Sequence, residues 1–171
     1  KNENLELIAY SNSQIKDSIN IKLKSHFTTW YEIASESNMN VINKIRKDGI
    51  HILVDLSGHS EKNRLPIFIN KPAPIQASWI SYPASTGIPE IDYMIGDRLV
   101  TPKNESKHFA EKIFRLSNMW VCFTPPDFDV EISEPPVIKS GYVTFGSFNH
   151  LSKINKKVIF LWSKVLRSIP K

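Results

Sequence analysis

The chain has 171 residues, enough for one good-sized domain or for one domain and part of another. Apolar residues make up 41% and charged residues 23%, a balance typical of a globular protein with a core. The net charge of +5 comes from scattered lysines rather than a dense basic stripe, so the sequence argues against a nucleic-acid-binding protein. No apolar stretch is long enough for a membrane span, which argues against a membrane protein.

Cys122 is the single cysteine, so the sequence excludes an internal disulfide and favours a reducing compartment. Its apolar surroundings, MWVCF, predict a buried, unreactive thiol. The first residues do not have the pattern of a signal peptide, and we expect a cytoplasmic protein. The chain starts without Met and stops directly after a predicted helix, which we interpret as the sign of a fragment of a longer protein.

Strands and helices alternate along the first 124 residues. Residues 51–57, HILVDLS, form a near-continuous run of β-formers, which predicts a strand buried on both faces. Further strands are predicted at 5–11, 27–33, 75–81, 91–97 and 112–117, and helices at 14–26, 40–50, 64–70 and 104–112. This alternation predicts an α/β fold with a Rossmann-like parallel sheet.

The last third of the chain is predicted to contain a domain boundary and the start of a second domain. Residues 125–140 are rich in proline and acidic side chains, which favours a linker. A strand at 142–148 and a helix N-capped by Asn155 follow, so we expect one α/β half over 1–124, without its first strand, and the start of a second half over 141–171.

Three loops carry chemistry where parallel strands are predicted to end, which is where open α/β sheets bind ligands. In FGSFNHLSKIN, Asn149 and His150 can donate hydrogen bonds, and Lys153 brings a positive charge to a helix start, as in a diphosphate clamp. The same residues also fit a solvated lysine and an ordinary turn. Local chemistry leaves both interpretations open.

The other two loops are equally ambiguous. In DLSGHSEKNR, Asp55 can orient a hydroxyl or an imidazole, Gly58 permits a tight turn and His59 can move protons, or Asp55 simply caps the turn. The SYPASTG loop combines hydroxyl groups with a rigid backbone, a composition that suits sugars or phosphates as well as ordinary loops. The histidines share no metal-ligand spacing, so no metal site is expected.

Together these segments resemble one family. ILVDLSGH, RLPIF, KPAPIQASW, SYPASTG and IDY, followed by FGSFNHLSKIN, occur in the order found in the catalytic region of O-linked N-acetylglucosamine transferases and their SPINDLY-like relatives. The match is strongest over 49–97 and 142–170. Ser81 and Gly96 depart from the family pattern, where Gly and Thr respectively are usual, and Ser81 puts the donor sugar in doubt.

The resemblance implies a GT-B enzyme with two Rossmann-like halves and a nucleotide sugar between them. It implies inverting transfer of a sugar, N-acetylglucosamine from UDP-GlcNAc, to Ser/Thr hydroxyls of proteins without a metal or other cofactor, and TPR repeats elsewhere in the parent protein. Catalytic roles are expected for Lys153, His59 and Asp55, and donor contacts for Asn149, His150, Lys153, Gly58, Tyr82, Pro83, Thr86 and Gly87.

Three alternatives remain beside this interpretation. The parent protein can be an O-fucosyltransferase that uses GDP-fucose, or a non-catalytic sugar-nucleotide-binding or scaffold module; nucleic-acid binding is a weaker third. Under the leading interpretation, the 171-residue chain by itself is expected to be inactive, because much of the donor cleft would lie outside it.

Overall fold

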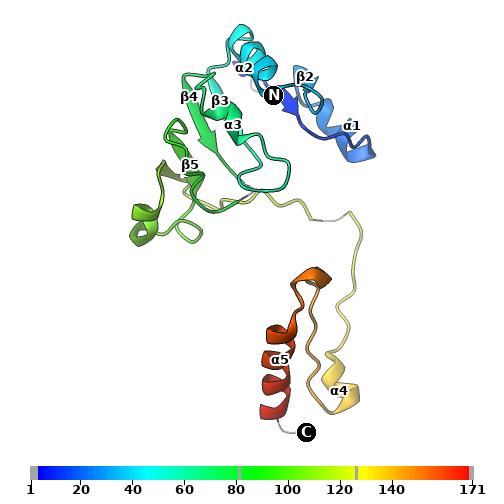
Figure 1. The fold of residues 1–171 in the computed structure, drawn as a ribbon. Helices are drawn as coiled ribbons and strands as arrows, with labels where there is room; N and C mark the ends of the chain where they lie inside the picture. Colours follow the sequence, from blue (N-terminus) through cyan, green and yellow to red (C-terminus); the bar gives the residue numbers. More distant parts are fainter. Residues whose placement is uncertain (1–3, 81, 126, 170–171) are drawn as a thin grey trace. The chain divides into compact units, whose positions relative to one another are not determined.

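A computed structural model describes residues 4–80, 82–125 and 127–169 of the chain. The chain divides into two compact units, Lys1–Phe123 and Thr124–Lys171, shown in Figure 1.

The first unit contains two sheets in which every strand pairing is parallel. β1 (Ile8–Ser11) pairs with β2 (Thr29–Glu32), and a four-stranded sheet has the order β3 (Ile52–Asp55), β4 (Ile75–Ser78), β5 (Tyr93–Gly96), β6 (Lys112–Arg115). Parallel strands need crossover connections. α1 (Ser18–Lys24), α2 (Asn38–Lys47), α3 (Leu65–Phe68) and the 3₁₀ helix η1 (Lys103–His108) lie in the connections between these strands. The predicted α/β class is therefore confirmed.

Local sequence explains where α2 begins and ends. The Ser37 side chain accepts a hydrogen bond from the Asn40 N–H at 3.1 Å, and Gly49 follows the helix with a left-handed φ of 65°. The predicted C-terminal breaker is confirmed. The helix predicted at 104–112 is instead the 3₁₀ helix η1, and β6 begins at Lys112.

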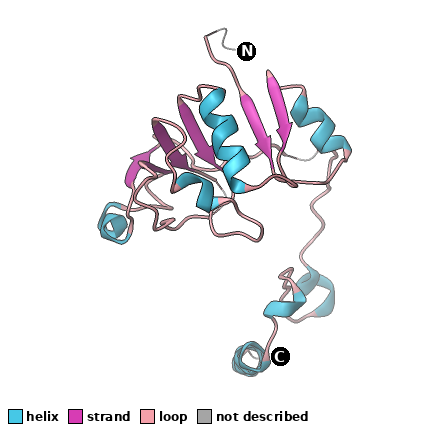
Figure 2. Cartoon of the chain, turned by 45° about the horizontal axis from the view of Figure 1, so that its top comes forward, coloured by secondary structure: helices cyan, strands magenta, loops and turns pink. Residues whose placement is uncertain are grey.

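The core lies between one face of the four-stranded sheet and helices α2 and α3 (Figures 1 and 2). Leu53 of β3 packs there with Val41, Ile42 and Ile45 of α2. The expectation that β3 is buried on both faces is wrong, because Ile52 is 57% exposed and Val54 is 37% exposed. Successive side chains of a strand point to opposite faces, and the described helices α2 and α3 cover only the face that carries Leu53.

Arg64 fastens the loop after β3 to the two-stranded sheet. Its guanidinium donates to Asn12 Oδ1 at 3.0 Å, to the Ile33 carbonyl at 3.2 Å, to the Glu36 carbonyl at 2.9 Å and to Asn38 Oδ1 at 2.9 Å. Because Asn12 follows β1, Ile33 follows β2 and Arg64 directly precedes α3, this side chain links the ends of two strands to the start of α3.

Gly96, at the end of β5, has no room for a side chain in this structure. A Cβ atom added at Gly96 would collide with the side chain of Thr101, whose hydroxyl donates to the Asp97 carbonyl at 2.9 Å. Thr101 is completely buried. The space that a residue-96 side chain would need is therefore occupied by the hydroxyl residue five positions later.

The second unit contains α4 (Pro136–Ser140), the 3₁₀ helix η2 (Leu151–Lys153) and α5 (Lys156–Ser168). The strand predicted at 142–148 is wrong: these residues have no strand conformation, and no strand is found in 124–125 or 127–169. A strand needs a neighbour to satisfy its backbone groups, and none is present in this described part. The predicted linker at 125–140 also contains α4 rather than being wholly irregular.

Two further expectations concern the surface. Cys122 is exposed, so the predicted buried thiol is wrong; Trp120, two residues earlier, is buried instead, with 7% of its surface exposed. Within 4–80, 82–125 and 127–169, the structure has no helix with the length and apolar character of a membrane span.

Candidate functional site

Asp55 shapes the turn at the carboxyl end of β3. Its carboxylate is buried and accepts from the Gly58 N–H at 2.8 Å, from the Ser57 N–H at 3.1 Å and from the Ser78 hydroxyl at 3.2 Å. The register places Asp55 opposite Ser78, so the carboxylate also joins the ends of β3 and β4. These contacts fit a turn-capping residue, and the expected catalytic role of Asp55 stays a prediction.

Gly58 allows this turn to approach the next loop. Its φ is 51°, in the left-handed region, and an added Cβ would lie 2.6 Å from Tyr82 Cβ. Both the backbone conformation and the close approach require glycine. Two segments that the sequence analysis singled out separately, the turn at 55–59 and the loop at 82–87, are thereby brought into direct contact.

His59 crosses from the first of these loops to the second. Its Nε2 lies 3.1 Å from the Ser85 carbonyl oxygen, and its ring meets the Tyr82 ring edge-on at a centroid distance of 5.5 Å. A carbonyl oxygen can only accept, so the hydrogen-bond chemistry puts a proton on Nε2. In the neutral ring, Nδ1 is then the acceptor, and His59 as a residue is exposed.

Glu111, which belongs to none of the motifs in the sequence, holds the 82–87 loop. It directly precedes β6 and is 5% exposed. Its carboxylate accepts from the Thr86 N–H at 2.7 Å, from the Thr86 hydroxyl and from the Ser85 hydroxyl at 2.9 Å. Nothing local marks this glutamate in the sequence, because its partners lie 25 and 26 residues away.

The remaining loop residues of the predicted donor site differ in accessibility. Tyr82 is 45% exposed and Pro83 is also exposed, whereas Thr86 is buried on Glu111. Gly87 has a left-handed φ of 71° and its N–H donates to the Ser85 hydroxyl at 3.1 Å. Ser81, whose identity bears on the donor pocket, lies outside the described residues.

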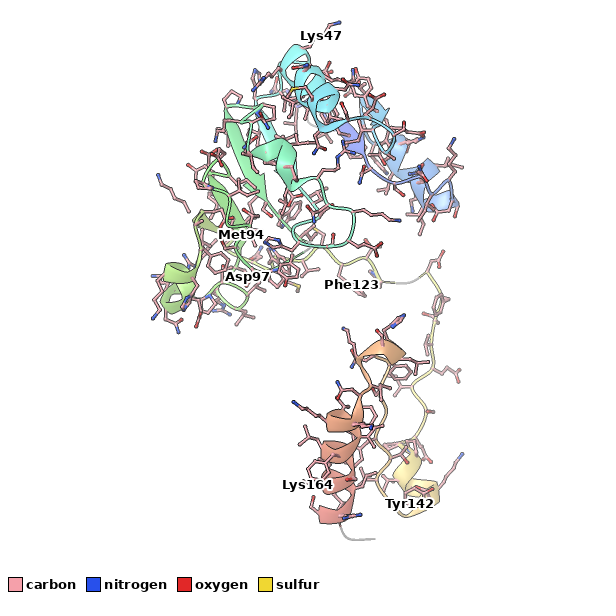
Figure 3. All side chains as sticks on the ribbon, viewed as in Figure 1. Lys47, Met94, Asp97, Phe123, Tyr142 and Lys164 are labelled. Atoms are coloured by element: carbon pink, nitrogen blue, oxygen red, sulfur yellow. The ribbon has the colours of Figure 1, made fainter. Side chains whose placement is uncertain are left out.

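Asp97 organises the next strand end, where it directly follows β5 near Met94 (Figure 3). Its carboxylate accepts from the backbone N–H groups of Leu99, Val100 and Trp120, at 2.8, 2.8 and 2.7 Å. The bonds from Val100 and Trp120 hold the pKa of Asp97 below its ordinary value, against the opposing effect of burial. Asp97 is therefore an ionised anchor for the chain after β6.

Asp92 is a second anchoring carboxylate, at the start of β5. It accepts from Lys71 Nζ at 2.5 Å and from the Gln76 N–H at 2.8 Å. Burial raises the pKa of Asp92, but the hydrogen bonds from Lys71 and Gln76 outweigh it, so the pKa lies below its ordinary value. Asp92 directly precedes β5, at the opposite end of that strand from Asp97, and we assign the pair to stability.

The second unit carries the other predicted site residues in one short stretch. His150 Nδ1 accepts from the Ser152 N–H at 3.3 Å and lies 2.8 Å from the Ser152 hydroxyl, so in the neutral ring the proton is on Nε2. Asn155 accepts from the Lys157 and Val158 N–H groups at 3.0 and 3.1 Å, which confirms the predicted N-cap of α5.

Asn149 and Lys153 are exposed beside this cap, and Lys153 is the last residue of η2. The exposed lysine three residues before the start of a 13-residue helix matches the arrangement expected for an anion site. Joint action of this stretch with His59 and the 82–87 loop stays a prediction. Among the described residues, no group of three or more His, Cys, Asp or Glu side chains is placed to hold a metal ion.

Comparison with known proteins gives the family. Residues 1–124 match Glycosyl transferase family 41. The chain is 39% identical over 141 residues, 82% of its length, to the tomato (Solanum lycopersicum) "Probable UDP-N-acetylglucosamine--peptide N-acetylglucosaminyltransferase SPINDLY". It is 35% identical over 171 residues, 98% of its length, to the protein of the same name from Oryza sativa subsp. japonica.

A solved structure shows the same fold. A Thermobaculum terrenum O-GlcNAc transferase mutant superposes with a TM-score of 0.82 at 33% identity, over 95% of this chain and 31% of that one. The chain spans 15% of the tomato protein and 18% of the rice protein. With a family match over residues 1–124 and a shared fold over nearly the whole length, the chain belongs to glycosyl transferase family 41.

Proposed function

We propose that this chain is part of a nucleotide-sugar-dependent protein O-glycosyltransferase. The reaction is transfer of N-acetylglucosamine from UDP-GlcNAc to Ser/Thr hydroxyls, with inversion at the anomeric carbon. The observation that carries the proposal is family 41 membership over residues 1–124, together with relatives that are named as UDP-N-acetylglucosamine--peptide transferases. The protein acceptor, TPR repeats elsewhere in the whole protein and a cytoplasmic location belong to the same proposal.

The chemistry needs a base for the acceptor proton and a positive charge beside the leaving diphosphate. The acceptor oxygen forms a bond to the anomeric carbon while the bond to the diphosphate oxygen breaks; the hydroxyl proton goes to a base, and the diphosphate leaves with the electron pair. A fixed positive charge lowers the barrier because negative charge grows on the leaving diphosphate. We assign that charge to Lys153, whose ammonium can do this without a metal ion.

The two loops of the first unit suit the sugar and acceptor side. His59 presents a nitrogen lone pair at Nδ1 when neutral, and Tyr82 presents an exposed ring beside it. Both are held by short loops at the carboxyl ends of parallel strands, the edge at which α/β sheets bind ligands. We assign Asn149 and the Nε2–H of His150 to the nucleotide side, since both can donate hydrogen bonds to base or phosphate oxygens.

The test uses the whole protein that contains this chain. UDP-GlcNAc and GDP-fucose are titrated by calorimetry into the wild type and into Lys153→Ala, and transfer to a protein acceptor is measured with each donor. We expect UDP-GlcNAc to bind and Lys153→Ala to lower kcat by about 10²- to 10³-fold, the loss seen when one group that stabilises developing negative charge is removed. The control is Lys164→Ala, because Lys164 lies over the Phe160 ring farther along α5.

Each contrary outcome identifies a different error. Binding and transfer with GDP-fucose alone would make the protein an O-fucosyltransferase, and binding of either donor without transfer would make it a non-catalytic nucleotide-sugar module. If neither donor binds, the proposed function is wrong. If Lys153→Ala behaves like Lys164→Ala, the assignment of residues 149–153 to the diphosphate is wrong.

A further inference from the structure

Glu111 is a buried carboxylate whose charge is compensated by a single loop. Within the described residues it forms no ion pair with a lysine, arginine or histidine. Its hydrogen bonds come from the Thr86 backbone, the Thr86 hydroxyl and the Ser85 hydroxyl. A carboxylate is costly to bury, and these three donors offset that cost only while the 82–87 loop keeps its present shape.

The Ser85 hydroxyl connects the Glu111 carboxylate to the backbone of the loop. It donates to Glu111 Oε2 and accepts from the Gly87 N–H and the Ala110 N–H, both at 3.1 Å. A hydroxyl has one hydrogen and two lone pairs, so all its hydrogen-bonding capacity is used and its bond directions are fixed. With the side chain and the following amide fixed, the direction of the Ser85 carbonyl is fixed as well.

That carbonyl is the one that accepts from His59 Nε2 at 3.1 Å. The carbonyl therefore selects the tautomer of the imidazole, and the Tyr82 ring at the other end of the same loop limits its rotation. The loop is also entered through Ile80, a β-branched residue with a φ of 68°. Such a backbone is disfavoured for any residue except glycine and persists only where the surroundings hold it.

We propose that Glu111 is a positioning residue of the transferase site, acting through the 82–87 loop to hold His59 with its proton on Nε2 and its Nδ1 lone pair toward the substrate. The inference rests on the proposed function. Glu111 itself does not touch the substrate in this arrangement. Its place in the reaction follows from a chain of contacts that runs from the carboxylate through Ser85 to the imidazole.

Replacement of Glu111 by Gln is the sharpest perturbation. The amide keeps the size of the carboxylate and one acceptor oxygen, but its NH₂ group cannot accept from the Ser85 hydroxyl. That hydroxyl already accepts two N–H groups, so the loop must rearrange. Ser85→Ala is a milder second variant, because it removes the hydroxyl and leaves the carbonyl. Glu105→Gln is the matched control, since Glu105 is exposed on η1 and lies beside His108 rather than the loop.

Two measurements on the whole protein test the inference. In ¹⁵N-histidine NMR, the signal that disappears in His59→Ala should report a protonated Nε2 in the wild type and in Glu105→Gln, and a tautomer mixture in Glu111→Gln. In kinetics, Glu111→Gln should lower kcat by about 10- to 100-fold, the scale of a misplaced catalytic group. In the His59→Ala background, Glu111→Gln should have no further effect on kcat.

The inference is overturned if the His59 tautomer is the same in Glu111→Gln and Ser85→Ala as in the wild type. It is also overturned if Glu111→Gln lowers kcat as much in the His59→Ala background as alone, because the carboxylate would then act by another route. The NMR measurement needs no turnover. Absence of transferase activity in the wild type would therefore contradict the proposed function, while the tautomer would still decide whether Glu111 positions His59.

Discussion

Substitution of Gly58 by Ala should loosen the contact on which the candidate site depends. A left-handed backbone costs a residue with a side chain about 1–2 kcal/mol, and Gly58 has a φ of 51°. The added Cβ would also lie 2.6 Å from Tyr82 Cβ, so one of the two loops must move. Overpacking of this kind costs about 1–3 kcal/mol. The two effects together predict that the free energy of opening of this region falls by about 2–5 kcal/mol.

Gly49→Ala is the matched control for this prediction. Gly49 has a similar φ of 65°, but an added Cβ would have no atom within 4 Å. Gly49→Ala should therefore lose only the free energy of adopting a left-handed backbone, about 1–2 kcal/mol. The difference between the two variants, about 1–3 kcal/mol, measures the collision with Tyr82 alone.

Native-state hydrogen exchange on the whole protein is a suitable assay, because it reports the free energy of local opening for individual amides. The Trp79 amide, which donates to the Asp55 carbonyl at 2.9 Å between β3 and β4, is the best probe. Protection there should fall more in Gly58→Ala than in Gly49→Ala. Equal protection in the two variants would refute the argument that the turn and the 82–87 loop are held in rigid contact.

Two further predictions concern the anchors of the first unit. Arg64→Lys should reduce the free energy of unfolding by about 2–4 kcal/mol, because a lysine cannot reproduce a guanidinium that bonds several acceptors at once. Urea denaturation should show a much smaller loss for the control Arg46→Lys, since the Arg46 guanidinium donates to one exposed carbonyl. Equal losses in the two variants would contradict the role of Arg64. The pKa of Asp92 is lower in the folded than in the unfolded protein, so its stabilising contribution is present above about pH 4 and is lost as the pH falls through the folded pKa. Lys71→Met should therefore lower stability at pH 7, and the urea midpoint of this variant should fall less between neutral and acidic pH than that of the wild type. An unchanged slope of the urea midpoint against pH would contradict the stabilising role of the Lys71–Asp92 pair.

Much of the fold was predictable because it depends on short-range patterns. Apolar runs such as residues 51–57 and 91–97 have few alternatives to a strand once Gly and Pro bound them. The N-cap at Asn155 and the breaker at Gly49 depend on backbone groups within four residues, so the sequence is sufficient there too.

The errors occur where a distant partner decides the outcome. Residues 142–148 have the composition of a strand, but a strand forms only beside another one, and the described part of the second unit has none. The exposure of Ile52 and Val54 likewise depends on which face the helices cover. Composition alone does not contain that information.

The candidate site divides in the same way. The sequence by itself determined the α/β class, the three loops that carry polar groups and the family resemblance, because these depend on residue order. Only the tertiary structure decided that Gly58 lies against Tyr82, that the Ser85 carbonyl sets the tautomer of His59 and that Glu111 holds this loop. The physical reason is that parallel register brings the ends of β3 and β4 together, whereas Glu111 directly precedes β6 at the opposite edge of the sheet. Glu111 meets Ser85 and Thr86 only because the chain runs back from the end of β4 toward the start of β5.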